Sequence, residues 1–263
     1  MRLLGEYGSV ASLMLQRELR IIASKWKIIA GSALVYASML GLSAGYFMPQ
    51  MGMPIAQSLP LFIGSFVISC LSIGYSFAIE AAYDLRSPKV AFYYYALPVS
   101  FSTMLASLVT VLMLRMLIVV LPVFLLGFTI IGQWHFFSIS WFGTVAMFFL
   151  GVQFFALLLL TLAHFCSLES LLGNIWPRFF SPLIAFGCAM YPLHIAIEKA
   201  WWLSRIMLFN PLTYCCDGLR SALFGGSQYL SFSFCIAMLL VYNGLLWCAL
   251  RYVVIRAINP VRA

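Results

Sequence analysis

A serine between two glycines is the feature of this sequence that comes nearest to a catalytic motif. Residues 41–45 read Gly-Leu-Ser-Ala-Gly and match the G-x-S-x-G pattern of hydrolases, which expose the serine on a strained turn between a strand and a helix. Here they lie inside an apolar run long enough to form a membrane helix. The same glycines match G-x-x-x-G, a spacing that lets two helices approach closely. We therefore expect Gly41 and Gly45 to pack helices, and we do not expect Ser43 to be a nucleophile.

The residue spacings that are typical of zinc sites, disulfide frameworks and ATP-binding loops are also absent from this sequence. His135, His164 and His194 fall in different segments, and the seven cysteines contain no C-x-x-C pair, so neither a zinc site nor a disulfide framework is predicted. ATP binding through a phosphate loop needs a lysine after a glycine, and no lysine here follows one. We predict no catalytic, cofactor-binding or metal-binding residue. Any ATP-driven work must come from a partner chain.

Carboxylates inside a membrane would indicate ion or proton coupling. The seven acidic residues all lie at or beyond the ends of the predicted spans, and Glu80 comes nearest to an exception. Its neighbours Asp84 and Arg86 favour a solvated helix end. An ion- or proton-coupled carrier and an integral membrane enzyme are the alternatives to a transport subunit, but the first lacks buried carboxylates and the second lacks a converging set of polar residues.

The composition is that of a membrane protein. Of the 263 residues, 64% are hydrophobic and 8% are charged, whereas a soluble domain has about 25% charged residues. A lipid bilayer accepts such a chain as helices of about 20 apolar residues. The net charge of +8 comes from basic residues spread among the apolar runs, with no basic stripe. We therefore expect the lipid bilayer, and no nucleic acid, as a partner.

The apolar runs predict an all-α integral membrane fold with six transmembrane helices. The fifth is short and contains Pro182 and Pro192, and residues 198–226 mix apolar and charged residues without a clean span. Such segments are typical of re-entrant helices, which we expect between the fifth and sixth spans. The six predicted spans are Ile28–Met48, Leu61–Ala82, one within Phe101–Ile131, Trp141–Phe165, Phe179–His194 and Tyr229–Tyr252. We expect an outer loop at Pro49–Pro60 between the first two spans and a cytoplasmic turn at Ser167–Arg178 between the fourth and the fifth.

The first 27 residues predict an amphipathic helix at the membrane interface. At helical spacing Arg17 and Arg20 share the polar face, and Trp26 lies on the apolar face. Basic residues concentrate on the side of this helix, so we expect both termini in the cytoplasm. The cytoplasmic set is Arg2, Arg17, Arg20, Lys25, Lys27, Arg86, Lys89, Arg178, Arg251, Arg256 and Arg262, whereas the outer segments hold Lys199, Arg205 and Arg220.

Arg115 lies within the third predicted span, and two placements compete. A span that starts near Leu105 puts Arg115 about 15 Å deep, where an arginine costs about 2.5 kcal/mol or more. A span that starts near Leu112 puts it one turn inside the cytoplasmic boundary, where its side chain reaches the headgroups. We favour the shallow placement because the apolar residues from Leu112 onward suffice to cross the bilayer.

Two stretches before the last span resemble a known family. Residues 187–192 read G-C-A-M-Y-P, and residues 210–220 read N-P-L-T-Y-C-C-D-G-L-R, with Trp201 and Trp202 between them. They resemble the type-2 permease subunit of ATP-binding cassette (ABC) transporters, in which a G-x-x-Y-P-like stretch closes the fifth span and an N-P-L-T-Y…D-x-x-R segment precedes the sixth. The resemblance implies an outer re-entrant motif formed by Tyr191, Pro192, Asn210, Pro211, Asp217 and Arg220.

A third stretch resembles the part of that family that meets the ATPase. Residues 96–100 read A-L-P-V-S and are similar to the L-x-x-P-[VI]-[SP] stretch of a cytoplasmic coupling helix. The chain departs from the family at residues 92–95, which read F-Y-Y-Y where members often carry an acidic, leucine-rich run. The residues implied in ATPase coupling are Asp84, Arg86, Tyr94, Leu97 and Pro98.

The resemblance implies a single type-2 transmembrane domain over residues 1–263. It would comprise the cytoplasmic interfacial helix at 1–27, the six-span region at 28–255 and a cytoplasmic tail at 256–263. Two such permeases, most simply a homodimer, would assemble with two ATPase subunits in the bacterial cytoplasmic membrane, with ATP and Mg on the ATPases. The family exports lipid-linked glycans, lipids and hydrophobic drugs, and nothing in this sequence chooses among these substrates.

Overall fold

The computed structural model describes residues 26–86, 101–132, 140–226 and 228–258, and residues 12, 16, 17, 19, 20 and 22–24 of the N-terminal segment. All regular structure in these residues is helical, which confirms the predicted all-α class. Five helices in this part of the chain are long and apolar enough to cross a membrane. They are Trp26–Gln50, Ile55–Asp84, Ser102–Ile131, Trp141–Phe165 and Phe232–Arg256.

The first two long helices are joined by a short turn. Helix α2 (Trp26–Leu42) continues through the π-helical turn η1 (Ser43–Phe47) into α3 (Met48–Gln50), and α4 (Ile55–Arg86) follows. The predicted outer loop was too long, because Pro60 lies inside α4. A proline near the start of a helix removes few intrahelical hydrogen bonds, so α4 accommodates it there.

The helix of the third predicted span fills the whole range within which that span was expected, and the helix of the fourth has the predicted limits. They are α6 (Phe101–Ile131) and α7 (Trp141–Phe165). Helix α7 begins where the Ser140 hydroxyl accepts a hydrogen bond from a backbone N–H at 3.3 Å, as an N-cap residue does. The last long helix, α13 (Phe232–Ile258), begins and ends later than predicted and therefore includes the first residues of the predicted tail.

The region of the predicted fifth span differs most from expectation. Its helical structure starts at α8 (Leu168–Gly173) instead of Phe179, and it runs almost without a break through η3 (Trp176–Phe180) to α9 (Ser181–Ala185). The predicted cytoplasmic turn is replaced by α8 because the Ser167 hydroxyl accepts a backbone N–H at 3.2 Å and caps that helix. None of these short helices counts as a span by itself, so the structure does not confirm six spans.

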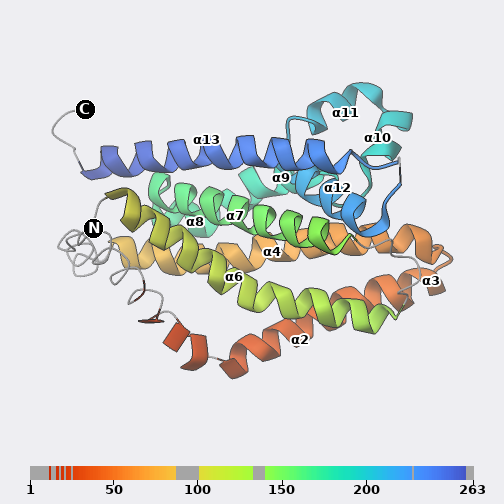
Figure 1. The fold of residues 1–263 in the computed structure, drawn as a ribbon, viewed down its shortest axis with the longest axis horizontal. Coiled ribbons are helices and arrows are strands. Elements are labelled where there is room, and N and C mark those ends of the chain that lie inside the picture. The colour runs from red at the N-terminus through yellow and green to blue at the C-terminus, as the bar shows by residue number, and fades with distance from the viewer. Residues whose placement is uncertain are drawn as a thin grey trace.

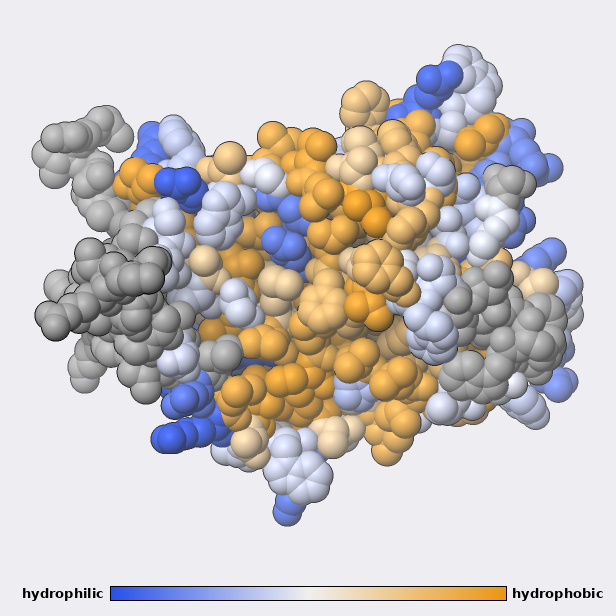
Figure 2. Space-filling view, in the orientation of Figure 1, coloured by the Kyte–Doolittle hydropathy of each residue, from blue (hydrophilic) through white to orange (hydrophobic). Residues whose placement is uncertain are grey.

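The long helices run roughly alongside one another, with α13 at one edge of the bundle and α2 at the other (Figure 1). Three short helices between α9 and α13 gather at one end: α10 (Leu193–Lys199), α11 (Trp201–Met207) and α12 (Pro211–Phe224). Helices α4 and α7 are the most buried of the long helices. On the face drawn in Figure 2, apolar side chains cover the middle of the bundle and hydrophilic ones gather toward its ends, as expected if the bilayer crosses the long helices.

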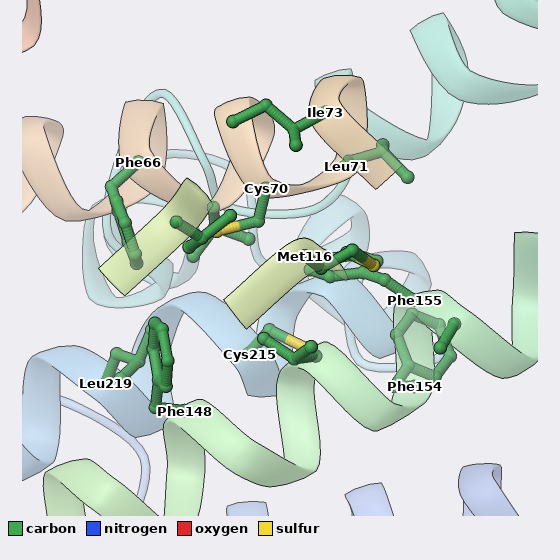
Figure 3. Packing of buried hydrophobic residues seen from close by; sticks show 14 of the residues in the cluster. Phe66, Cys70, Leu71, Ile73, Met116, Phe148, Phe154, Phe155, Cys215 and Leu219 are labelled. Carbon is green, nitrogen blue, oxygen red and sulfur yellow. The ribbon is translucent and has the colours of Figure 1, made fainter. Parts of the chain in front are cut away.

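The core is formed where α12 meets the long helices. Phe66 and Cys70 of α4, Met116 of α6, Phe148 of α7 and Cys215 of α12 are all buried in one cluster (Figure 3). The rings of Phe66 and Phe148 stack with centroids 6.0 Å apart. A segment with no clean span of its own is thus packed into the same close-packed core as the membrane helices.

The glycines of the G-x-x-x-G pattern lie where α2 contacts α6. A Cβ atom added to Gly41 would lie 2.9 Å from Cβ of Ile130, and one added to Gly45 would lie 3.1 Å from Cα of Ile131. Ser43 lies within the continuous helical stretch, in η1, so it does not occupy the strand-to-helix turn that a hydrolase serine needs. The prediction that these glycines pack two helices is confirmed.

We expect Gly41→Ala to lower the free energy of unfolding in detergent by about 1–3 kcal/mol, because the added methyl group overpacks the contact with Ile130. The matched control is Gly31→Ala on the same helix, where an added Cβ meets nothing within 4 Å. We expect the control to leave stability unchanged or to raise it by up to about 1 kcal/mol. Equal effects of the two variants would show that α2 and α6 do not meet at Gly41.

Candidate functional site

Helix α12 begins at two of the residues predicted for the outer motif. The side-chain oxygen of Asn210 accepts the backbone N–H of Leu212 at 3.0 Å, so Asn210 is the N-cap, and Pro211 occupies the first helical position. The side-chain amide of Asn210 also donates to the carbonyl of Leu183 at 2.7 Å. One side chain therefore both starts α12 and ties it to α9.

Two more predicted residues of this motif, Tyr191 and Pro192, lie at the end of the turn between α9 and α10. The Tyr191 hydroxyl donates to the carbonyl of Ala185 at 3.0 Å, and Pro192 is the N-cap residue of α10. Within the turn Cys188 has a φ of 54°, a left-handed conformation that is uncommon for a residue with a side chain. The carbonyl groups of this turn lie outside helices and need other hydrogen-bond partners.

Arg220 supplies those partners. Its Nη1 donates to the carbonyl of Cys188 at 2.6 Å, and its Nη2 donates to the carbonyl of Ala189 at 3.0 Å. Its Nε donates to the carbonyl of Pro60 at 3.0 Å. The side chain has no exposed surface. A single guanidinium therefore joins α12, the turn after α9 and the start of α4, three segments that are distant in the sequence.

The charge of Arg220 is balanced within the same helix. Its Nη1 also donates to Oδ1 of Asp217 at 3.0 Å, and both side chains are fully buried. Helix α12 is not one of the five candidate spans, and there burial raises the pKa of the Asp217 carboxyl while Arg220 opposes that rise. The guanidinium's planar set of five donors suits several acceptors at once, which a lysine ammonium would not match.

Two residues that this arrangement needs, Gly64 and Pro60, were not predicted from the sequence. A Cβ atom on Gly64 of α4 would lie 1.7 Å from the carbonyl oxygen of Ala189 and 2.9 Å from Nη2 of Arg220. Only glycine leaves room there for the turn and the guanidinium. Pro60 contributes through its backbone carbonyl, which no sequence pattern identifies. In the sequence Gly64 is visible only as a glycine within an apolar span, and such a glycine does not by itself identify a close packing contact.

Two of the residues expected to couple to an ATPase, Asp84 and Arg86, lie at the opposite end of α4. Asp84 is exposed. Arg86 donates to the carbonyls of Ala82 at 3.0 Å and Ala163 at 3.1 Å, and it also donates to the carbonyl of Cys166. The guanidinium thereby satisfies free carbonyls at the C-terminal ends of both α4 and α7. This end of α4 is fixed to α7 in the way that the other end is fixed to α12.

The remaining predicted residues are only partly described. Tyr94, Leu97 and Pro98 lie outside the described residues. Arg17 and Arg20 are helical and exposed, and Trp26 starts α2 with 60% of its surface exposed. Among the described residues, no group of three His, Cys, Asp or Glu side chains is placed to hold a metal ion.

Comparison with known proteins gives one match. The family model described as ABC-2 type transporter matches residues 10–224, which is more than half of the chain and includes the outer-end cluster around Arg220. No curated protein and no solved structure matches.

We expect Arg220→Met to lower the free energy of unfolding in detergent by about 3–5 kcal/mol, because it leaves Asp217 as an unpaired buried charge. The matched control is Arg205→Met, which removes an exposed arginine from α11 and should change stability by no more than about 0.5 kcal/mol.

A double variant separates charge pairing from packing. Asp217→Asn combined with Arg220→Met should cost less than the sum of the two single variants, because the remaining partner is no longer charged. If Arg220→Met is as stable as Arg205→Met, Arg220 does not hold the three segments together.

Proposed function

Because the chain belongs to the ABC-2 type transporter family, we propose that it is the permease subunit of an ATP-binding cassette exporter. It would form the translocation pathway for an amphipathic or hydrophobic substrate such as a lipid-linked glycan, a lipid or a drug. The match over residues 10–224 is the observation that carries this proposal. The five long apolar helices support it, because they make the chain a multi-pass membrane protein.

Six spans, with re-entrant helices before the last, remain the topology that we propose. The nearly continuous helical segment from Leu168 to Ala185 reaches about 27 Å at 1.5 Å per residue, close to the thickness of a bilayer core. We assign it as the fifth span, which places Arg178 of η3 within this span and not on the cytoplasmic side where the sequence predicted it. Helices α10, α11 and α12 then lie on the outer side, with α12 drawn into the helix bundle by its buried residues.

The distribution of charge supports an orientation with both termini in the bacterial cytoplasm. Arg86 and Arg256 lie at the C-terminal ends of α4 and α13, which are at the same end of the bundle in Figure 1. Lys199 and Arg205 lie in α10 and α11 at the other end. Basic residues that flank apolar spans favour the cytoplasmic side.

The ATPase would act on α4 through the segment that follows it. In the proposed assembly two copies of this chain pair with two ATPase subunits, which hold ATP and Mg. A displacement passed from Tyr94, Leu97 and Pro98 would reach Asp84 and Arg86. Arg86 joins α4 to α7, so the two helices would move together. The same helix carries Pro60 at its other end, where Arg220 would transmit the movement to α12.

One argument against a carrier has to be corrected. The sequence showed no carboxylate within a predicted span, yet Asp217 is fully buried in the protein. Its Oδ1 accepts Arg220 at 3.0 Å, so the carboxylate is paired and lies in a short outer helix. A proton carrier needs a carboxylate that changes its partner during transport. The Asp217–Arg220 pair is better explained as the packing contact that holds α12.

We expect the purified chain alone to hydrolyse no ATP, and we expect co-expression with a partner ATPase to yield a complex that hydrolyses ATP and transports substrate.

Tyr94→Asp or Leu97→Asp should leave the chain folded and uncouple transport. A charge in an apolar contact with the ATPase would remain poorly paired, at a cost of about 2–5 kcal/mol. ATP turnover and transport in reconstituted vesicles are the measurements.

The matched control is Met51→Asp, which places the same charge on an 87% exposed side chain in the turn before α4. This variant should transport normally. ATP turnover by the rigorously purified chain alone would contradict the proposed division of labour. Normal coupling in both Tyr94→Asp and Leu97→Asp would show that the contact with the ATPase lies elsewhere.

A further inference from the structure

Helix α11 and the turn that follows it carry an exposed face of aromatic, aliphatic and basic side chains. At helical spacing this face consists of Trp201, Trp202, Arg205, Ile206 and Phe209, all of them exposed. Trp201 is 68% exposed and Phe209 is 82% exposed. The opposite face, with Ser204 and Met207, is buried against the protein. A contiguous apolar face of this kind marks a surface that another apolar phase covers.

The end of α11 lies beside a membrane-crossing helix. Helices α10 and α11 project from the side of the bundle next to α13 (Figure 1). The Tyr242 hydroxyl of α13 donates to the carbonyl of Phe209 at 2.8 Å. Tyr242 lies ten residues after Phe232, where α13 starts, which is about 15 Å along the helix. The turn after α11 is therefore level with the apolar part of α13 and does not extend beyond its outer end.

The backbone of this turn needs no water. The last carbonyls of a helix have no partner within the helix and usually turn to water. Here the carbonyls of residues 207–209 accept hydrogen bonds from the hydroxyls of Thr213, Tyr214 and Tyr242, in that order. A turn inside a bilayer is stable only when its polar backbone groups are satisfied by the protein. The turn after α11 meets this condition although the Phe209 side chain beside it is exposed.

The side chains of the exposed face match the layers of a lipid leaflet. Tryptophan is enriched at the membrane–water interface, where its ring is partly apolar and its N–H finds a polar partner. Among the described residues Arg205 has no ion-pair partner. An arginine at this level reaches a lipid phosphate and forms charge-assisted hydrogen bonds with it. Ile206 and Phe209 offer only apolar surface, which hydrocarbon covers at no polar cost.

We propose that the exposed face of α11 inserts into the outer leaflet of the bilayer beside α13 and binds phospholipid there. Arg205 holds a lipid phosphate, Trp201 and Trp202 lie among the headgroups, and Ile206 and Phe209 contact the acyl chains. The lipid thereby fixes the outer side of α11, while the buried face fixes α11 to the protein. The word outer rests on the orientation proposed above, but the contact with phospholipid does not depend on what the protein transports.

Spin labelling of the full chain in liposomes of phosphatidylethanolamine and phosphatidylglycerol tests the contact. The label is attached to Phe209→Cys in a chain that carries Cys166→Ser and Cys248→Ser, the two cysteines that are not buried. Its collisions with lipid-soluble oxygen and with a water-soluble nickel complex are measured by electron paramagnetic resonance. The label should collide more with oxygen, as should a label at Leu240→Cys on the 53% exposed face of α13. A label at Asp84→Cys, at the polar end of α4, should collide more with nickel.

Two charge reversals test the phosphate contact. Arg205→Glu should abolish the oxygen preference of the label at residue 209, because a carboxylate is repelled by the lipid phosphate. Lys199→Glu reverses an exposed charge on α10, outside this face, and should leave the preference unchanged. An unchanged label at Leu240→Cys in both variants shows that the bundle is intact. A nickel preference at residue 209 in the parent chain, exclusion of both reagents as by a second copy of the chain, or an unchanged preference in Arg205→Glu would each overturn the proposal.

Discussion

The hydrogen bonds of the buried Arg220 guanidinium are the contact on which the outer half of this structure depends. An arginine without exposed surface is costly unless a partner balances its charge and acceptors meet its N–H groups. Asp217 provides the charge, and the carbonyls of Pro60, Cys188 and Ala189 provide further acceptors. The acceptors come from segments that are distant in the sequence. Satisfying one side chain therefore fixes the relative positions of α4, α12 and the turn after α9.

Helix α4 is attached to its neighbours at both ends. Arg220 binds a carbonyl near its start, and Arg86, its last residue, binds carbonyls of α7. If the chain works with a separate ATPase, as we propose, a helix attached at both ends could carry a displacement from one end of the bundle to the other. Helices α2 and α6 are in close contact at Gly41, and a cavity lies between α2, α4 and α6 nearer to the start of α2.

The sequence predicted the long helices well because their apolar runs are uninterrupted and their boundaries carry local signals. Helix α7 has the predicted limits and α6 fills the expected range for that reason. The fifth span was misplaced because Ser167 caps a helix that begins in the predicted turn, and Pro182 falls near the start of α9, where a proline does little harm. The residues of the predicted outer motif make the contacts described above, and these contacts could not be predicted from the sequence. Arg220 binds mostly backbone carbonyls, which any residue type could provide, and Gly64 is visible as essential only when the turn packed against it is known.

Hydrogen–deuterium exchange of the full chain in lipid nanodiscs tests most directly whether Arg220 fixes the outer segments. The amides of α12 should exchange as slowly as those of α7, because both helices belong to one buried core. In Arg220→Met, exchange should accelerate in α12 and in residues 186–192, while the amides around Gly41 and Ile130 keep their wild-type rates. Fast exchange throughout α12 in the wild-type chain, or slow exchange that persists there in Arg220→Met, would contradict this account.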